Sequence, residues 1–203
     1  MLATHGEPPH DNKRSEVIAT PFGHTLMGVA VGQLGAPRSF AQSWYWLLFS
    51  VFAANAADLD FFPGLLAGDM NVYHHAATHS FGAAAMFALI VWAVARRFSQ
   101  RAGRIAVLGG LIYTSHVLVD YITEDSRSPY GIPLFWPFSN EYYISPWTIL
   151  GGVKHGVPGD SLATVMGHIF SWHNLKTLGL EAIVIVPVLV VIWWINRIRA
   201  QQD

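Results

Sequence analysis

The chain has 203 residues, of which 52% are hydrophobic and 12% charged, with a formal net charge of -1 and no cysteine. This length fits one domain, and a mean hydropathy of +0.34 favours a membrane protein. The absence of cysteine excludes disulfides, thiol nucleophiles and Cys-ligated zinc. The near-neutral charge, without basic clusters that contain aromatics, gives no support for nucleic-acid binding.

The first 20 residues are predicted to form a disordered tail, because they are polar, rich in proline and histidine, and not periodic. Its histidines, His5 and His10, are expected to be functionally silent. Residues 21–199 are predicted to form a single membrane-embedded domain. Within it, Thr25–Gly35 is a candidate helix, too short to cross a hydrocarbon core of about 30 Å.

The remaining apolar runs predict an all-α, multi-pass helical bundle with four to five membrane-embedded helices. They are Ser43–Ala57, His79–Arg97 with Thr78 as a possible N-cap, Ile105–Ile122, and Leu178–Ile195. Between the last two lies Thr123–Thr177, which contains five prolines and is predicted to be a long irregular loop outside the membrane.

Four arginines predict the orientation in the inner (plasma) membrane. Arg96, Arg97, Arg101 and Arg104 crowd one short connection, which the positive-inside rule places in the cytoplasm. The polar residues at the other helix ends then face the extracytoplasmic side.

Histidines and aspartates gather at those ends and offer the nitrogen and oxygen donors that bind Zn²⁺ or Mn²⁺. The candidate metal ligands are His24, Asp58, Asp60, His74, His79, His116 and Asp120. They would hold one or two ions, zinc by preference.

The pair formed by His116 and Asp120 is spaced to lie on one face of a helix. An ionisable group within a span costs on the order of 2–3 kcal/mol, which favours a functional role over a hydrogen-bonded polar pair. Asp58 and Asp60 cannot share a helical face, but a helix ending in a turn at Phe61–Gly64 would aim both at a cation. The alternative for this pair is a solvated helix terminus.

The segment from His74 to His79 leaves two alternatives open. Helical spacing pairs His75 with His79, whereas an N-cap at Thr78 leaves His74 and His75 in a loop. His24, taken alone, is more typical of a cap or surface residue.

Three further polar residues lie in the predicted loop or shortly after it. Glu181 falls in the first turn of the last predicted span, where the helix dipole favours a carboxylate, or where it could orient a metal-bound histidine. His168 and His173 are predicted to be surface residues.

Several motifs in chain order resemble the YdjM-like family of membrane-bound metal-dependent hydrolases, also described as LexA-binding and inner-membrane-associated. They are GHTLMGVAVG, ADLDFFP, HHAATHS, HVLVDYIT and GIPLFWPFS. The family pattern reads His-Arg-Gly-x-Thr-His-Ser at the central string, so the resemblance implies His74 rather than His75 as a ligand. His75 takes the place of an arginine.

The chain departs from that pattern at two further places. Glu124–Ser128 looks like an insertion, and Asn140 stands where an acidic residue is common. A more distant similarity, in the His-x3-Asp pair with upstream donors, links the chain to zinc-dependent phospholipase C enzymes and implies a phosphoester substrate.

Together these features predict a hydrolase that cleaves a phosphoester or lipid-type substrate through a metal-activated water. Asp58, His116 and Asp120 would be catalytic, with His75 and Glu181 around the ligands or at the substrate. The expected partners are membrane lipids and a small-molecule or lipid substrate.

Nearby aromatics would either surround a headgroup or anchor the protein at the interface, and Lys154 or His155 could meet a phosphate. The aromatics are Trp136, Phe138, Tyr142, Tyr143 and Trp147. The alternatives to hydrolysis are a metal-binding membrane scaffold and an ion transporter.

Overall fold

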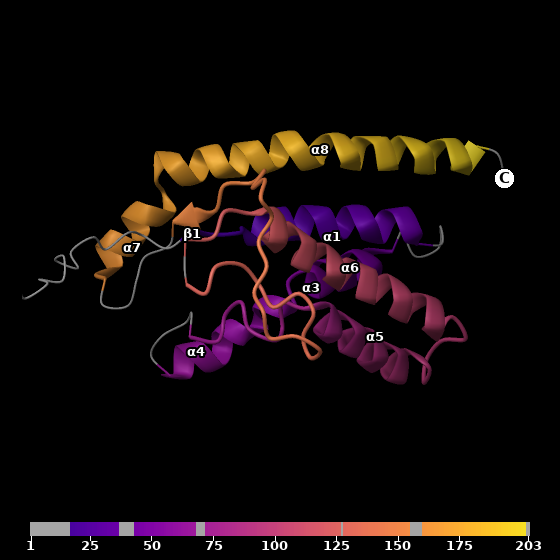
Figure 1. The fold of residues 1–203 in the computed structure, drawn as a ribbon. Coiled ribbons are helices and arrows are strands. Elements are labelled where there is room, and N and C mark those ends of the chain that lie inside the picture. Colours follow the sequence, from indigo (N-terminus) through magenta and orange to yellow (C-terminus); the bar gives the residue numbers. More distant parts are fainter. Residues whose placement is uncertain (1–16, 37–42, 68–71, 127, 155–159, 202–203) are drawn as a thin grey trace, which may run out of the picture.

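The computed structural model describes residues 17–36, 43–67, 72–126, 128–154 and 160–201, and it is mostly helical (Figure 1). The all-α prediction is confirmed to that extent. A single pairing of two short strands joins distant parts of the described chain. The elements are β1 (Val17–Ile18), α1 (Pro21–Gly35), α3 (Trp44–Ala54), the 3-10 helix η1 (Ala57–Asp60), α4 (Phe61–Ala67), α5 (Phe81–Ala95), α6 (Ala102–Ile122), β2 (Val153–Lys154), α7 (Leu162–Ile169) and α8 (Trp172–Gln201).

Helix α6 is the centre of the packing. It contacts α5, α1 and α3, and two apolar clusters on its surface form much of the core. Helix α8 contacts α1 and runs above the other helices in Figure 1. Helix α1 therefore lies between α6 and α8 and contacts both.

Small residues allow α1 to lie close to α3. A Cβ on Gly28 would lie 2.3 Å from the Cβ of Ala54 and 3.2 Å from Ile112 Cγ2. Helices in membranes commonly use small residues to bring their backbones together. The His24 side chain, one turn earlier on α1, is held at its position by this close approach.

We expect Gly28→Ala to lower the stability of the fold by about 1–3 kcal/mol, because the added methyl overlaps α3. The measurement is the thermal unfolding midpoint of the purified protein in detergent. Gly179→Ala is the matched control, since a Cβ at Gly179 in α8 meets nothing within 4 Å. That variant should keep or slightly raise the midpoint, and equal midpoints for both variants would contradict the close packing.

Two stretches of the described chain are long and apolar enough to cross a membrane: α6, with 21 residues, and Leu162–Ile198, which includes most of α8. Helices α3 and α5 are apolar but have 11 and 15 residues, short of the roughly 20 that a span requires. The structure therefore supports two candidate spans, and the predicted four to five are not confirmed.

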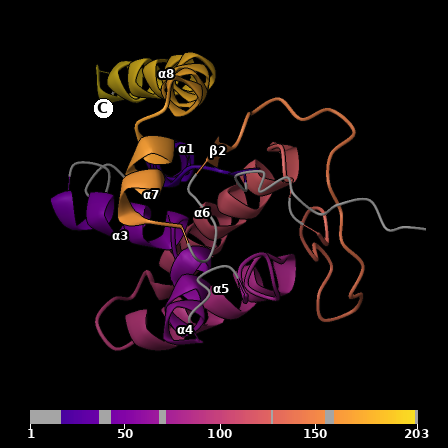
Figure 2. The same cartoon turned by 90° about the vertical axis from the view of Figure 1, so that its left-hand side faces the viewer.

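The segment after α6 is irregular over a shorter length than predicted. It leaves the helices as an extended loop on one side, which Figure 2 shows, and ends at β2. The prediction of an irregular Thr123–Thr177 is wrong from Leu162 onward, where α7 and the start of α8 form. Ser161 caps α7 by accepting a hydrogen bond from the Thr164 amide.

The prediction of a disordered tail over residues 1–20 is wrong for its last four residues. Residues 1–16, including His5 and His10, lie outside the described residues, but Val17 and Ile18 pair with Lys154 and Val153. Ala19 and Thr20 are then buried. This strand pairing was not visible locally, because its partner lies more than 130 residues away.

Candidate metal centre

Two residues of the centre come from the last turns of α6. His116 and Asp120 lie one turn apart on its buried face, with exposures of 0% and 5%. The His116 Nε2 atom is 3.1 Å from Asp120 Oδ2. The predicted pairing on one helical face is therefore present.

Asp58 enters from η1, directly after α3. Its Oδ1 lies 3.5 Å from His116 Nε2 and 3.5 Å from His79 Nε2. The expected turn at Phe61–Gly64 is wrong, because these residues begin helix α4. The 3-10 geometry of Ala57–Asp60 instead redirects the chain, so that both carboxylates reach histidines.

His79 comes from the loop before α5. The prediction that Thr78 caps this helix is wrong: Ser80 is the N-cap, and its hydroxyl accepts from the Ala83 amide. Thr78 instead donates to Asp60 Oδ2 at 2.6 Å, and its carbonyl accepts from the Tyr113 hydroxyl. These contacts fix the loop, and they leave His79 fully buried.

His24 joins the group from α1. Its Nε2 is 3.3 Å from Asp120 Oδ1, and its ring stacks on that of His116 with centroids 3.7 Å apart. At 2% exposure it is not a surface residue.

The donor atoms of the five side chains gather around His116 Nε2, the central point of the group, with spacings that suit a metal ion. In the closest pairs, an imidazole Nε2 and a carboxylate oxygen lie 3.1 to 3.6 Å apart. Donors about 2.1 Å from a tetrahedral zinc are separated by about 3.4 Å. Two overlapping triads with donor atoms within 4.8 Å occur here: His24, Asp58 and His116, and His79, His116 and Asp120.

Unpaired buried atoms support this fit. His79 Nε2, His116 Nε2 and Asp120 Oδ2 are buried and have no hydrogen-bond partner. Buried polar atoms almost always have one, so three that face one another fit a site with a further group between them. A divalent cation bound by all three would satisfy them together.

Four imidazoles are oriented in the same way, with Nδ1 against an oxygen. The partners are Ala54 O for His116 at 2.7 Å, Asp60 Oδ2 for His79 at 3.2 Å, Asp60 Oδ1 for His74 at 3.1 Å and Asp125 Oδ2 for His75 at 3.2 Å. A proton on Nδ1 that is donated to an oxygen leaves the Nε2 lone pair available to a metal.

The charges outside the membrane helices follow from these contacts. Burial would raise the pKa of Asp58, but His116 and His79 hold it at about 2. Burial lowers the pKa of His74 to about 4, against the opposing contact with Asp60. For His79, burial also lowers the pKa, yet the Asp58 and Asp60 carboxylates raise it to about 10. His79 thus holds a proton that a bound cation would replace.

The other predicted ligands lie around this group. Asp60 contacts His74 and His79 at Nδ1, so it orients two imidazoles rather than facing the central point. His74 stacks on Phe61 and lies 3.9 Å from Asp58 Oδ1 through Nδ1. Helical spacing does not describe His75. It lies in the loop before α5, as the N-cap alternative expected, although the cap is Ser80 rather than Thr78, and its φ is 59°.

Glu181 is predicted to lie in the first turn of its helix. This is wrong, because α8 begins earlier, at Trp172. Its buried carboxylate accepts a hydrogen bond from the hydroxyl of Thr20, the N-cap of α1. Glu181 therefore contacts α1, the helix that carries His24, rather than the donors of the centre.

The remaining candidates are dispersed. Lys154 lies in β2 and His155 outside the described residues. His168 is half-buried in α7, and His173 contacts the carbonyl of Gly152 through Nε2. The aromatics Phe138 and Trp147 are strongly exposed.

Three residues around the centre were missed by sequence reasoning: Asp125, Thr78 as a partner of Asp60, and Tyr113. A signal existed for Asp125, since it lies in the apparent insertion at Glu124–Ser128. None existed for Tyr113, which resembles an ordinary core aromatic of α6.

We expect Asp60→Asn to weaken zinc binding about 10–100-fold, because an amide cannot hold the Nδ1 protons of two imidazoles as a carboxylate does. The measurement is zinc affinity by competition with a chromogenic chelator. Glu141→Gln, which removes an exposed carboxylate that accepts from Tyr143, is the control and should bind like the wild type. Unchanged affinity in Asp60→Asn would contradict the orienting role.

Comparison with known proteins gives one match. A family model described as YdjM inner membrane protein matches residues 20–199. No curated protein and no solved structure matches the chain.

Proposed function

The chain belongs to the YdjM inner membrane protein family, and from this premise we propose that it is a membrane-bound metal-dependent hydrolase. Its substrate would be a phosphoester or a lipid-type molecule at the membrane surface. The single observation that supports this most directly is the convergence of five donor side chains, four of them buried and Asp58 partly buried, from α1, η1, the loop before α5, and α6.

The residues that would hold the ion are His24, Asp58, His79, His116 and Asp120. A bound zinc or manganese ion lowers the pKa of a coordinated water toward about 7 and polarises a phosphoryl oxygen. Asp58, with a side-chain exposure of 17%, is the most accessible of the five. Its carboxylate would accept a hydrogen bond from the water that attacks the substrate. The others, which are almost fully buried, keep bulk water away from the centre.

The position of the centre along α6 supports a substrate at the membrane surface. At about 1.5 Å per residue the helix is roughly 31 Å long, close to the thickness of the hydrocarbon core. Arg101 and Arg104 lie at its first end, and His116 and Asp120 at its last. A spanning α6 would thus place the centre near one surface, the extracytoplasmic one by the positive-inside rule.

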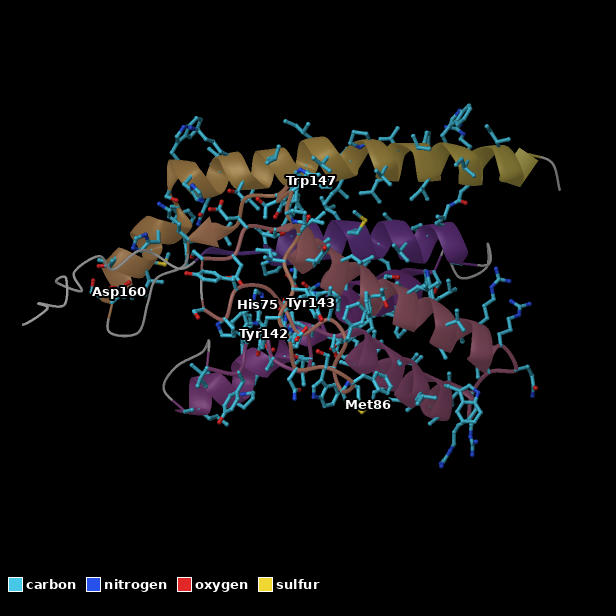
Figure 3. The ribbon with its side chains drawn as sticks, viewed as in Figure 1. His75, Met86, Tyr142, Tyr143, Trp147 and Asp160 are labelled. Atoms are coloured by element: carbon cyan, nitrogen blue, oxygen red, sulfur yellow. The ribbon has the colours of Figure 1, made fainter. Side chains whose placement is uncertain are left out.

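A pocket of about 90 Å³ adjoins the centre. It is lined by Val72, His74, His75, Ala76, Asp125, Ser128, Pro129 and Tyr142. His75 and Tyr142, which both line this pocket, appear beside one another in Figure 3. A pocket of this size suits a phosphate-sized group rather than a whole lipid, whose chains would extend into the membrane.

One alternative has a specific observation in its favour. Five protein donors can fill the coordination of zinc and leave no position for water, which is typical of a structural site and fits a membrane scaffold. The transporter alternative predicts donors spread through the membrane depth. Here they lie together at one end of α6.

The test is hydrolysis by the purified protein after its metal has been removed and restored. Phospholipid vesicles and a chromogenic phosphodiester serve as substrates, with zinc or manganese added back. We expect turnover only in the loaded protein, and its loss in Asp58→Ala. A wild-type protein that binds metal and hydrolyses neither substrate would favour the scaffold.

A further inference from the structure

His75 is held by a carboxylate outside the set that surrounds the central point. Its Nδ1 lies 3.2 Å from Asp125 Oδ2, which also accepts a hydrogen bond from the Gly131 amide at 2.9 Å. The His75 Nε2 atom is buried and has no hydrogen-bond partner. This is the arrangement in which a carboxylate fixes a histidine so that its other nitrogen can bind a metal.

The backbone at His75 brings two imidazoles to the same side. Its φ of 59° lies in the left-handed region, which residues other than glycine rarely adopt without compensation. As a result the rings of the adjacent His74 and His75 lie only 4.3 Å apart between centroids. Donor atoms of His74, His75 and His79 all lie within 4.8 Å of one another.

His79 already turns its Nε2 toward Asp58 and Asp120, at 3.5 and 3.6 Å. His74 and His75 are therefore the imidazoles of this group that remain for another ligand. Both face the pocket of about 90 Å³, which has room for an ion with coordinated water or a substrate oxygen. Imidazole donors suit zinc among the divalent cations that occur in proteins.

We propose that His74 and His75, the latter oriented by Asp125, bind a second divalent cation at the pocket beside the first. The proposal rests on the proposed function, because a second cation beside the first would supply further positive charge to bind and polarise a phosphoester substrate.

The two residues that distinguish this position contact one another although 50 positions separate them in the chain. An arginine is always protonated and cannot bind a cation. His75→Arg therefore removes a donor of the second position.

The experiment is zinc stoichiometry of the purified, zinc-saturated full chain after removal of free metal, with zinc and protein measured independently. We expect two ions per chain in the wild type and in the His168→Gln control, and one in His75→Arg. Asp125→Asn should lose the second ion about 10–100-fold more readily than the wild type, with the first unchanged. In the manganese-loaded wild type, electron paramagnetic resonance should show coupling between two ions that His75→Arg abolishes.

The results that would contradict the second position differ from those that would contradict the proposed function. One ion in the wild type would overturn the second position and leave the proposed function intact, as would two ions that persist in His75→Arg. A wild type that binds no zinc would overturn both. Circular dichroism and size-exclusion profiles identify a variant that has lost its fold, in which case Asp125→Asn decides alone.

Discussion

Replacement of His116 or Asp120 by alanine is expected to leave the protein with little bound metal. Loss of an orienting residue alone weakens metal sites about 10–100-fold, and loss of a direct donor should exceed this. His116 Nε2 and Asp120 Oδ2 lie at the shortest separation in the centre, 3.1 Å. Both atoms are buried and have no hydrogen-bond partner. The measurement is metal content after purification from zinc-replete and manganese-replete cells.

The matched control is Ser115→Ala, on the same helix. Ser115 is buried, and its hydroxyl donates to the Ile112 carbonyl of its own helix. It should retain wild-type metal content. Full metal occupancy in both His116→Ala and Asp120→Ala would contradict the assignment of the centre, and equal losses in the control would indicate a general effect on folding.

The second large effect expected is that cysteines introduced beyond the two ends of α6 react from opposite sides of the membrane. Because the chain contains no cysteine, single cysteines can be introduced as Ser99→Cys, in the arginine-rich connection, and Asn140→Cys, in the exposed part of the long loop. By the positive-inside rule, a maleimide that cannot cross membranes should label only Asn140→Cys in intact cells.

Permeabilised cells provide the control, since both cysteines should then react. Labelling of Ser99→Cys in intact cells would reverse the orientation and place the metal centre on the cytoplasmic side. Protection of both until permeabilisation would contradict α6 as a span between two aqueous faces.

The helices could largely be predicted from the sequence because their signal is local. Runs such as Ile105–Ile122 are mostly apolar, and burial of an apolar helix depends little on which neighbour covers it. Boundaries were less accurate where polar and apolar residues alternate. Ser80 and Thr78 are both plausible N-caps, and only the contact between Thr78 and Asp60 decides between them.

The residue types of the centre were also accessible from the sequence, since histidine and aspartate are costly in a membrane without a function. Their separate roles were not. Asp58 and Asp60 differ by one residue, but a 3-10 turn sends one toward the central point and the other behind two imidazoles. The contact between His75 and Asp125 spans 50 positions and leaves no periodic trace.

The order of the elements along the chain has a consequence for biosynthesis. Every donor side chain discussed above, up to Asp125, belongs to the first part of the chain, whereas α8 follows and contacts α1 and β2. At typical rates of synthesis the roughly 80 remaining residues take about 4–16 s to emerge. The donors of the candidate metal centre can therefore come together while α8 is still being made.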